Sequence, residues 1–437
     1  MRALRILTEG ADAPEPLDAG GYLARGGYAG LRKALEMGAR KVVEEVRDAK
    51  LLGRGGAAYP AGSKWEHLMD IGAFPKHIVC NADEGEPGTF KDRFIMERVP
   101  FRLIEGMTIA GLVFGSSTGF VYVRGEYRSV QRGFMRAMES ARFLNLLGRD
   151  IMGSGLDFDI AVVSGAGAYV CGENSALLNS TQGLAGRPRI KPPHLAEVGL
   201  FGAPTLVNNV ETFANVPSIV TMGGTAFLEA GHPDSGGTKL VCLSGHVARP
   251  GVYEVPLGSV TLREAVFSPE LGGGLRDGAR VGFLHLGGQS GPLAPPELLD
   301  TVYSYSDLRK AGLSVGSGAV VVADDTVNVL DYLMSVARFF VRESCGKCTP
   351  CRTGNPAVLK ILQDLSVPGL ADRRTLEKLW ALADVMTQCS FCGLGRTATV
   401  ALKSAWKAFP EEIERNAIRL SQKDGASRRE VSAFPSF

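Results

Sequence analysis

The sequence predicts an α/β protein with a mainly parallel sheet, followed by a small α+β module and a helical bundle. Short apolar runs alternate with helix-like segments between residues 76 and 225, and such alternation is typical of a parallel sheet covered by helices. Residues 238–325 contain short strands, turns and one short helix, whereas the chain from residue 328 onward is helical. A run of cysteines lies within this helical part and is the strongest chemical signal in the sequence.

The composition is that of a folded protein with two to four domains. The chain has 437 residues, of which 45% are hydrophobic and 22% are charged, and this length exceeds one simple core. The net charge of +2 gives no reason to expect nucleic acid or anionic lipid as a partner. No segment reaches the roughly 18 apolar residues of a membrane span, and residues 1–10 lack the apolar core of a signal peptide. We therefore expect a cytoplasmic protein, without direct membrane insertion, whose reduced cysteines serve as ligands.

The first half of the chain is expected to hold the parallel sheet. Helix-forming composition marks residues 28–37 and 40–49, so residues 1–50 are expected to form a helical lead-in. Strands are expected at residues 77–80, 120–123 and 158–163. Helices are expected at residues 101–113, 129–147, 175–181 and 208–221. Because ligands of such sheets bind beyond the carboxyl ends of the strands, the loops after the strands are candidate sites.

A glycine-rich loop precedes this sheet. Residues 52–65 combine closely spaced small residues with the positive charges of Arg54 and Lys64. Small residues leave main-chain N–H groups accessible, which suits a phosphate or the ribityl chain of a flavin. A flexible linker is the alternative, but a linker seldom carries Tyr59 and Trp65 within so few residues.

Two further loops follow expected strands. Residues 81–88 form an acidic loop whose carboxylates could bind ribose hydroxyls, although a solvated acidic turn explains them equally well. Residues 164–174 contain Gly165-x-Gly167, but Val170 stands at the third position of a G-x-G-x-x-G pattern. This incomplete pattern is a weak signal that an ordinary glycine turn also explains.

The second half of the chain divides into two modules. For the first we expect strands at residues 239–244, 281–286 and 319–323, a hairpin that starts with residues 249–255 and a helix at 262–267. This module has no clustered chemistry and is expected to be a scaffold or docking domain, with Cys242 as a buried structural thiol. For the second module we expect helices at 328–342, 355–365, 373–387, 396–408 and 411–420. Pro356 is expected at a helix start, and residues 422–437 are expected to form a polar, disordered tail.

The cysteines of the helical module predict a metal centre. Cys345, Cys348 and Cys351 form a C-x2-C-x2-C run, and Cys392 lies further along the chain. Thiolates at two-residue intervals with a distant fourth cysteine favour a [4Fe–4S] cluster. Zinc is the alternative, because Cys389 and Cys392 themselves form a C-x2-C pair and thiolates also select zinc.

Five motifs in a fixed order carry a resemblance to a known family. They are residues 53–56 (GRGG), 80–93 (CNADEGEPGTFKDR), 165–173 (GAGAYVCGE), 208–212 (NNVET) and 343–352 (ESCGKCTPCR). Together they closely resemble the NADH- and FMN-binding flavoprotein subunit of respiratory complex I. The same module serves as the diaphorase subunit of NAD-dependent formate dehydrogenases and hydrogenases. The resemblance covers about residues 25–420.

The resemblance implies where the cofactors bind. The residues expected to bind FMN and NADH are Gly53, Arg54, Gly55, Gly56, Lys64, Asn81, Asp83, Glu84, Glu86, Tyr169, Gly172, Glu173, Asn174, Asn208, Asn209 and Thr212. Within this set Glu86 would lie near NADH, and Asn208, Asn209 and Thr212 would hold the phosphate side. The expected cluster ligands are Cys345, Cys348, Cys351 and Cys392, which leaves Cys389 outside the cluster.

The resemblance also implies the domains and the activity. A Rossmann-like FMN- and NADH-binding domain would span residues 51–237, a β-grasp domain 238–327 and a four-helix bundle with the [4Fe–4S] cluster 328–421. NADH would give a hydride to FMN, and electrons would pass singly through the cluster to a [2Fe–2S] thioredoxin-like subunit and a larger iron–sulfur subunit. This is the electron-entry step of an NADH:quinone oxidoreductase held at the cytoplasmic side of the inner membrane, and it requires no catalytic side chain. A diaphorase subunit and a non-catalytic zinc- or cluster-bearing scaffold are the alternatives.

The sequence departs from the family at a few positions. Asn174 stands where family members commonly carry a second glutamate, so we expect weaker exclusion of NADPH. His67 and His194 stand where the family has aromatic rings, and Tyr59 replaces a common phenylalanine. Because an imidazole stacks less surface than a phenyl ring, stacking on NADH is expected to differ, unless both histidines are ordinary surface residues.

Overall fold

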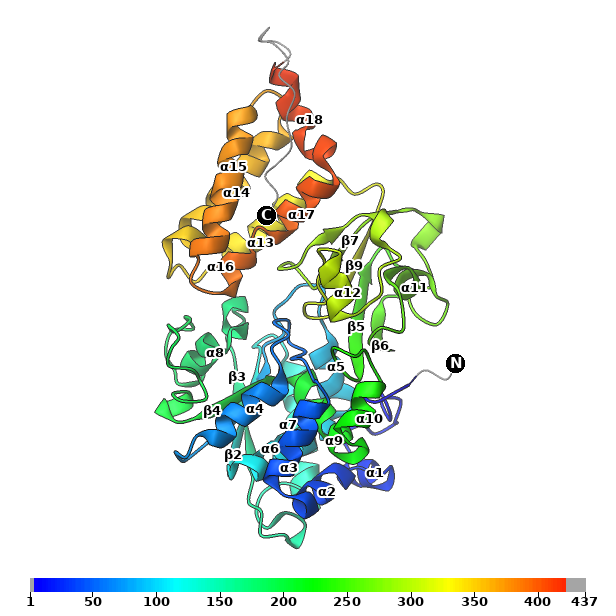
Figure 1. Cartoon of the computed structure of the whole chain (residues 1–437), viewed down its shortest axis with the longest axis vertical. Helices are drawn as coiled ribbons and strands as arrows, with labels where there is room; N and C mark the ends of the chain where they lie inside the picture. The colour runs from blue at the N-terminus through cyan, green and yellow to red at the C-terminus, as the bar shows by residue number, and fades with distance from the viewer. Residues whose placement is uncertain (1–3, 422–437) are drawn as a thin grey trace. The chain divides into compact units, whose positions relative to one another are not determined.

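The computed structural model in Figure 1 describes the backbone of residues 4–421 and the side chains of residues 4–415. The described residues form two compact units that divide after Thr326. The first unit contains a four-stranded and a five-stranded sheet, and the second contains helices. The predicted α/β class is therefore confirmed, whereas the predicted tail at residues 422–437 lies outside the described residues. None of the helices in the described part combines the length and the apolar character that a membrane crossing requires.

The first sheet is parallel throughout and has the strand order β3-β2-β1-β4. Its strands are β1 His77–Ala82, β2 Thr118–Val123, β3 Asp159–Ser164 and β4 Thr205–Asn209. In the register of the sheet, Cys80 of the central strand lies between Val121 and Asn208. The chain crosses outward from β1 to β2 and β3 and then returns to the other side of β1. The topological switch point, where ligands of such sheets bind, is therefore between β1 and β4.

Helices cover this sheet and bury its apolar side chains. They are α1 Ala19–Ala24, α2 Ala29–Met37, α3 Ala39–Asp48, α4 Ala61–Asp70, α5 Lys91–Arg98, α6 Pro100–Phe114, α7 Arg128–Phe143, α8 Asn174–Thr181, α9 Val210–Met222 and α10 Gly224–Glu229. The apolar helix α6 packs against α9, and both contact the central strand β1. The core that they form includes Ile78, Cys80 and Ala82, which point to the same face because side chains alternate along a strand.

The structure corrects the sequence prediction at several elements of this unit. The predicted helix at 208–221 begins only at Val210, and the residues before it form strand β4, which the prediction missed. Asn209 ends the strand and caps helix α9 by accepting from Glu211 N at 3.0 Å. The prediction also missed α4 and α5, because both follow loops whose glycines and polar residues dominated the local pattern.

The second sheet is mixed and has the strand order β6-β5-β9-β7-β8. Its strands are β5 Thr238–Gly245, β6 Gly251–Pro256, β7 Val281–Leu286, β8 Leu293–Ala294 and β9 Ala319–Asp324. The neighbours β5 and β9 are parallel, while the other pairs are antiparallel. Helices α11 Leu262–Phe267 and α12 Tyr305–Lys310 accompany it. Cys242 is buried in β5, as predicted.

A buried ionic cluster joins the two sheets within the first unit. The carboxylate of Glu211, in the first turn of α9, accepts from Lys239 Nζ of β5 at 2.6 Å and from Leu240 N at 2.9 Å. Lys91 Nζ of α5 lies 3.1 Å from the same carboxylate. All three charged side chains are inaccessible to solvent or nearly so. A carboxylate of the first module therefore neutralises a lysine of the second.

The second unit consists of helices. They are α13 Val329–Glu343, α14 Thr349–Ser366, α15 Arg373–Cys389, α16 Gly393–Thr397, α17 Val400–Ala408 and α18 Pro410–Ser421. In Figure 1 they run from yellow to red, and α13, α14 and α15 pack in succession. The predicted position of Pro356 at a helix start is wrong, because α14 begins at Thr349 and contains Pro356 in its interior. Pro350 takes the place in the first turn where a missing N–H costs nothing.

Replacing Glu211 by alanine is expected to lower the free energy of unfolding by about 3–5 kcal/mol, because two lysines then remain buried beside each other. Burial raises the pKa of the Glu211 carboxyl, but Lys239 and Lys91 outweigh it and hold the pKa below its ordinary value. The ionised Glu211 carboxylate therefore contributes its full stability at pH values above the pKa that this carboxyl has in the unfolded chain. The contribution is lost as the pH falls through the lower pKa of the folded state. Urea unfolding at several pH values measures this.

The matched control is Glu97→Gln, which breaks the ion pair with Arg93 on the surface of α5. An exposed pair of this kind contributes at most about 1 kcal/mol. Equal losses of stability in the two variants would contradict a special role for the buried cluster.

Candidate functional site

Asn81 organises the carboxyl end of β1 at the switch point of the parallel sheet. Its Nδ2 donates to the main-chain O of Gly172 at 2.8 Å and to Asn174 Oδ1 at 3.1 Å. Its Oδ1 accepts from Asp83 N at 3.1 Å. The structure therefore brings together four residues that the sequence predicted from two separate loops.

Asn209 does the same at the carboxyl end of β4. Its Nδ2 donates to Asp92 Oδ2 at 2.6 Å and to the main-chain O of Asn81 at 3.4 Å. Its Oδ1 accepts from Lys91 Nζ at 3.3 Å. Lys91 and Asp92 belong to the first turn of α5 and lie in the KDR part of the second sequence motif, but the prediction did not assign them to the site.

The glycine-rich loop lies against Asn209 at the carboxyl end of β4. Gly53 N donates to the main-chain O of Tyr59 at 2.9 Å, which closes the loop. A Cβ on Gly55 would lie 3.0 Å from the Cβ of Asn209, so the main chain approaches Asn209 more closely than a side chain would allow. Gly56 has φ +130°, which favours glycine. The loop thus presents backbone at the switch point, as a closely bound phosphate or ribityl chain requires.

Arg54 lies in this loop, but its charge is directed into the protein. The guanidinium is buried and donates to the main-chain O of Gly236 at 2.7 Å, to Ser235 Oγ at 3.1 Å and to Tyr305 Oη at 3.3 Å. Its main-chain N donates to Thr212 Oγ1 at 2.9 Å. Arg54 and Thr212, both predicted site residues, therefore fix the loop against α9 and the second module.

Lys64 is the cation that remains available in this region. It lies on α4, and its Nζ donates to the main-chain O of Val207 at 3.1 Å. Among the described residues no carboxylate lies within ion-pairing distance of it. Burial, with a smaller effect of the Lys191 charge, lowers the pKa of Lys64 to about 8. An anionic group bound beside Lys64 would raise this pKa again and keep the ammonium group charged. The Lys64 ammonium group therefore fits a phosphate.

Two carboxylates of the acidic loop have different environments. Glu84 is buried and accepts from Asp92 N at 2.8 Å and Arg93 N at 3.0 Å at the start of α5. Burial and the nearby Asp92 charge raise the pKa of Glu84 to about 7. Glu86 accepts from Tyr169 Oη at 2.6 Å and, from the second module, from Ser290 N at 3.0 Å. Glu84 therefore anchors the loop, while Glu86 stands where three segments meet.

The remaining predicted residues lie on α8 and β4. Glu173 caps α8 by accepting from Ser175 N at 2.9 Å, and its other oxygen lies 3.0 Å from Lys191 Nζ. The charge of Glu173 is therefore already compensated. With its amide oxygen facing the indole, Asn208 accepts from Trp65 Nε1 at 3.0 Å. Asn208 is buried and supports α4, the helix that carries Lys64.

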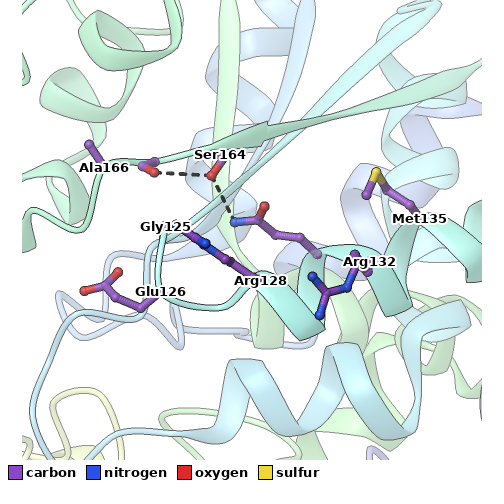
Figure 2. Close-up of a pocket in the computed structure, with 9 residues that line it drawn as sticks. Gly125, Glu126, Arg128, Arg132, Met135, Ser164 and Ala166 are labelled. Carbon is purple, nitrogen blue, oxygen red and sulfur yellow. Dashed lines mark hydrogen bonds between the residues drawn. The ribbon is translucent and has the colours of Figure 1, made fainter.

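Figure 2 shows a separate cavity at the carboxyl ends of β2 and β3. Its volume is about 580 Å³, and its lining includes Arg128, Arg132 and Met135 of α7. Ser164 Oγ accepts from Gln131 Nε2 at 3.1 Å at its edge. None of the predicted cofactor-binding residues lines this cavity.

The second unit brings the four predicted cysteine ligands together. Cys348 occupies the N-cap position of α14, Cys351 lies in the first turn of that helix, and Cys392 occupies the N-cap position of α16. Burial raises the pKa of the Cys351 thiol, Ser344 opposes this, and the nearby thiols of Cys348, Cys392 and Cys345 raise it further. Four soft thiols thus meet at the ends of two helices, which fits an iron–sulfur cluster or zinc.

Hydrogen bonds already reach these sulfurs. Asn355 Nδ2 and Ser344 Oγ each lie 3.2 Å from Cys351 Sγ, and Phe391 N donates to Cys348 Sγ at 3.5 Å. Cys389, at the end of α15, is exposed.

Comparison with known proteins identifies both parts of the chain. Residues 46–218 match the family model of the Nuo51 FMN-binding domain. Residues 331–416 match that of the NADH-ubiquinone oxidoreductase-F iron–sulfur binding region. The second match decides between the two metal centres in favour of iron and sulfur.

Individual relatives cover nearly the whole chain. An NADH-quinone oxidoreductase F subunit of Rhizobium meliloti (strain 1021) is 43% identical over 409 residues, covering 93% of this chain and 96% of the relative. The HndC subunit of the NADP-reducing hydrogenase of Solidesulfovibrio fructosivorans is 40% identical, covering 94% and 83%. A chain in the crystal structure of an NAD+-reducing [NiFe]-hydrogenase in the H2-reduced state is 33% identical with a TM-score of 0.82, covering 95% of this chain and 67% of that chain. This chain therefore belongs to the family of NADH-quinone oxidoreductase F subunits, and its cofactors are FMN and a [4Fe–4S] cluster.

Proposed function

We propose that this chain is the electron-entry subunit of an NADH-quinone oxidoreductase and oxidises NADH. The observation that carries the proposal is the presence of an FMN-binding domain and an iron–sulfur region in one chain. When bound, FMN accepts a hydride from NADH and releases electrons one at a time, which an iron–sulfur centre requires. The side chains take no covalent part in this reaction. They bind FMN and NADH, orient them toward each other and exclude water.

The residues at the switch point are proposed to hold FMN. Gly53, Gly55 and Gly56 present backbone to its ribityl and phosphate groups, and Lys64 supplies the positive charge. Asn81, Asp83 and Asn209 would contact FMN from the ends of β1 and β4. Gly172, whose main-chain O accepts from Asn81, would contact it from the neighbouring loop. Arg54, Glu84, Asn208 and Thr212 support this arrangement by fixing the loops. The hydrogen bonds of these residues, which join the loops to one another and to the residues that follow β1 and β4, support this assignment.

Nicotinamide dinucleotide is proposed to bind beside Glu86, Tyr169, Glu173 and Asn174. The imidazoles of His67 and His194 lie edge to face, with ring centroids 6.3 Å apart. His67 Nε2 also lies 4.0 Å from Glu197 Oε1. These contacts favour a paired role at the rim of the site over two unrelated surface histidines.

Electrons are proposed to leave through the cluster bound by Cys345, Cys348, Cys351 and Cys392, to a partner iron–sulfur subunit. We propose a [2Fe–2S] thioredoxin-like subunit and a larger iron–sulfur subunit as these partners, and a place at the cytoplasmic side of the inner membrane through them. We also propose the three domains at residues 51–237, 238–327 and 328–421. A diaphorase subunit of an NAD-linked hydrogenase is the second candidate, and the similarity to the hydrogenase chains supports it.

The test of this function uses protein purified without oxygen. Its FMN, iron and labile sulfide are measured, and then NADH is added with ferricyanide as the acceptor. We expect one flavin and one cluster per chain and NADH-dependent reduction of the acceptor. Protein that holds both cofactors but does not oxidise NADH would contradict the proposal.

Cys392→Ser is expected to remove the cluster, about four iron atoms per chain, because the cluster then lacks its fourth thiolate. Cys389→Ser is the matched control, since it removes an exposed cysteine three positions earlier. Iron, labile sulfide and the visible spectrum measure the result. Loss of iron in the Cys389→Ser variant, with retention in Cys392→Ser, would exchange the two assignments.

FMN affinity is expected to fall as the pH rises through about 8. Lys64 has a pKa of about 8 in the free site, and a bound phosphate raises it, so binding above this pH takes up a proton. Lys64→Met is expected to weaken FMN about tenfold to a hundredfold at pH 7 and to abolish the pH dependence. Fluorescence titration of the FMN-depleted protein measures both.

The control for Lys64 is Lys50→Met, because the Lys50 ammonium also donates to a carbonyl, that of Pro233, but is exposed. This variant is expected to bind FMN as the wild type does. A wild-type affinity that is constant from pH 7 to pH 9 would contradict the assignment of Lys64 to the phosphate.

Asn174→Glu is expected to lower kcat/KM for NADPH about tenfold, with a smaller effect for NADH, because the new charge repels the additional phosphate. Gln182→Glu adds the same charge at the other end of α8 and serves as the control. Steady-state kinetics with both dinucleotides measure the ratio. An unchanged ratio in Asn174→Glu would show that this position does not select the dinucleotide.

A further inference from the structure

A loop of the second module reaches the carboxylate that is proposed to meet NADH. The loop comprises residues 287–292 and connects β7 to β8. Ser290 N donates to Glu86 Oε1 at 3.0 Å, and Ser290 Oγ lies 3.3 Å from Glu86 Oε2. Tyr169 Oη lies 2.6 Å from Glu86 Oε2 and 2.6 Å from Ser290 Oγ. Three hydroxyl and carboxylate groups from three distant segments therefore form one triangle.

The backbone of this loop is built for that approach. A Cβ on Gly288 would collide with Cγ of Glu86, and Gly288 has φ +89°. Any side chain at this position would displace the carboxylate. The glycine at 288 therefore serves a close contact with Glu86 in addition to the turn.

The two hydroxyl groups of this triangle have fewer protons to donate than the triangle has oxygen–oxygen contacts. A hydroxyl has one proton to donate, so Tyr169 and Ser290 cannot donate along all three edges at once. Ser290 can turn its proton from Glu86 to Tyr169 without moving its oxygen. One acceptor position on Glu86 then becomes available to a hydroxyl or amide donor of a dinucleotide.

The charge of Glu86 depends on the same neighbours. Burial raises the pKa of the Glu86 carboxyl, and donors from Tyr169, Ser290 and Gln289 oppose the rise. Tyr169 is the titratable side chain among these groups, and each of them acts on Glu86 through a hydrogen bond. The neighbouring carboxylate of Glu84 is directed to the start of α5. The ionised form of Glu86 is therefore stabilised by hydrogen-bond donors, and those from Ser290 and Gln289 come from the second module.

We propose that Ser290 is a positioning residue of the dinucleotide site, which holds the Glu86 carboxylate in place to accept hydrogen bonds from NADH. The second module thereby contributes a loop to substrate binding in addition to serving as a scaffold. This inference rests on the proposed function, because it requires that Glu86 contacts the dinucleotide.

The experiment compares Ser290→Ala with the wild-type holoenzyme from pH 5.5 to 8.5, using NADH and ferricyanide. Loss of the hydroxyl donor is expected to move the acid limb of kcat/KM to higher pH by about one unit. At pH 6 the KM for NADH is expected to rise about tenfold while kcat changes less than about twofold. Calorimetric titration with NAD+ in two buffers, a readout independent of turnover, is expected to show greater proton release on binding near pH 6.5.

Three further variants make the result specific. Ser290→Thr keeps the hydroxyl and is expected to restore the wild-type limb. Tyr169→Phe removes the other hydroxyl donor and is expected to move the limb in the same direction as Ser290→Ala, which also tests the inference if Ser290→Ala does not fold. Ser259→Ala removes an exposed hydroxyl that bonds only within its own turn, to Pro256 O, and is expected to change nothing.

Glu86→Gln distinguishes a wrong assignment of Glu86 in the proposed function from a wrong role for Ser290. If this variant leaves the KM for NADH unchanged, the assignment of Glu86 in the proposed function is wrong. If it raises the KM and removes the acid limb while Ser290→Ala and Tyr169→Phe leave the limb in place, the role of Ser290 is overturned and the proposed function stands.

Discussion

The structure of the first unit depends on the charge of Glu211. This carboxylate lies in the first turn of α9, directly after the switch-point strand β4, and it neutralises Lys239 of the second sheet and Lys91 of α5. A buried charge is tolerated only when it is paired and hydrogen-bonded. The two sheets are therefore held together directly after the carboxyl end of β4. The same cluster keeps Lys91 beside Asn209. The ion pairs of Glu211 therefore both hold the modules together and position a residue that contacts the proposed site.

The arrangement of the loops follows from this constraint. The glycine-rich loop is attached to the second module through Arg54, and the acidic loop is attached through Glu86. Both loops also contact the ends of the parallel strands. A dinucleotide-binding sheet usually forms its site from its own loops. Here a second sheet fixes two of them, which reduces the loop ordering that binding would otherwise require.

Much of this fold was predictable from the sequence, because apolar periodicity marks strands and helices wherever the core is local. Strands β1, β2, β3 and β7 lie within two residues of their predicted bounds. The strand β4 was missed because it is only five residues long and ends in two asparagines. The site was predicted from motifs and their family resemblance, which name residues but not their partners. Ser290 and the inward direction of Arg54 depend on contacts between residues far apart in the chain, and no local pattern contains them.

Asn209 shows what this interdependence means for variation of the sequence. Its amide oxygen caps α9 and accepts from Lys91, while its nitrogen donates to Asp92 and to the end of β1. Aspartate would keep the acceptor but place a second carboxylate against Asp92, and serine would be too short to serve both sides. A glutamine would move both ends away from the strand. Among the residues at the ends of β1 and β4, Asn209 should therefore tolerate substitution least. It carries no net charge, but its planar amide places a hydrogen-bond acceptor and a donor on opposite sides.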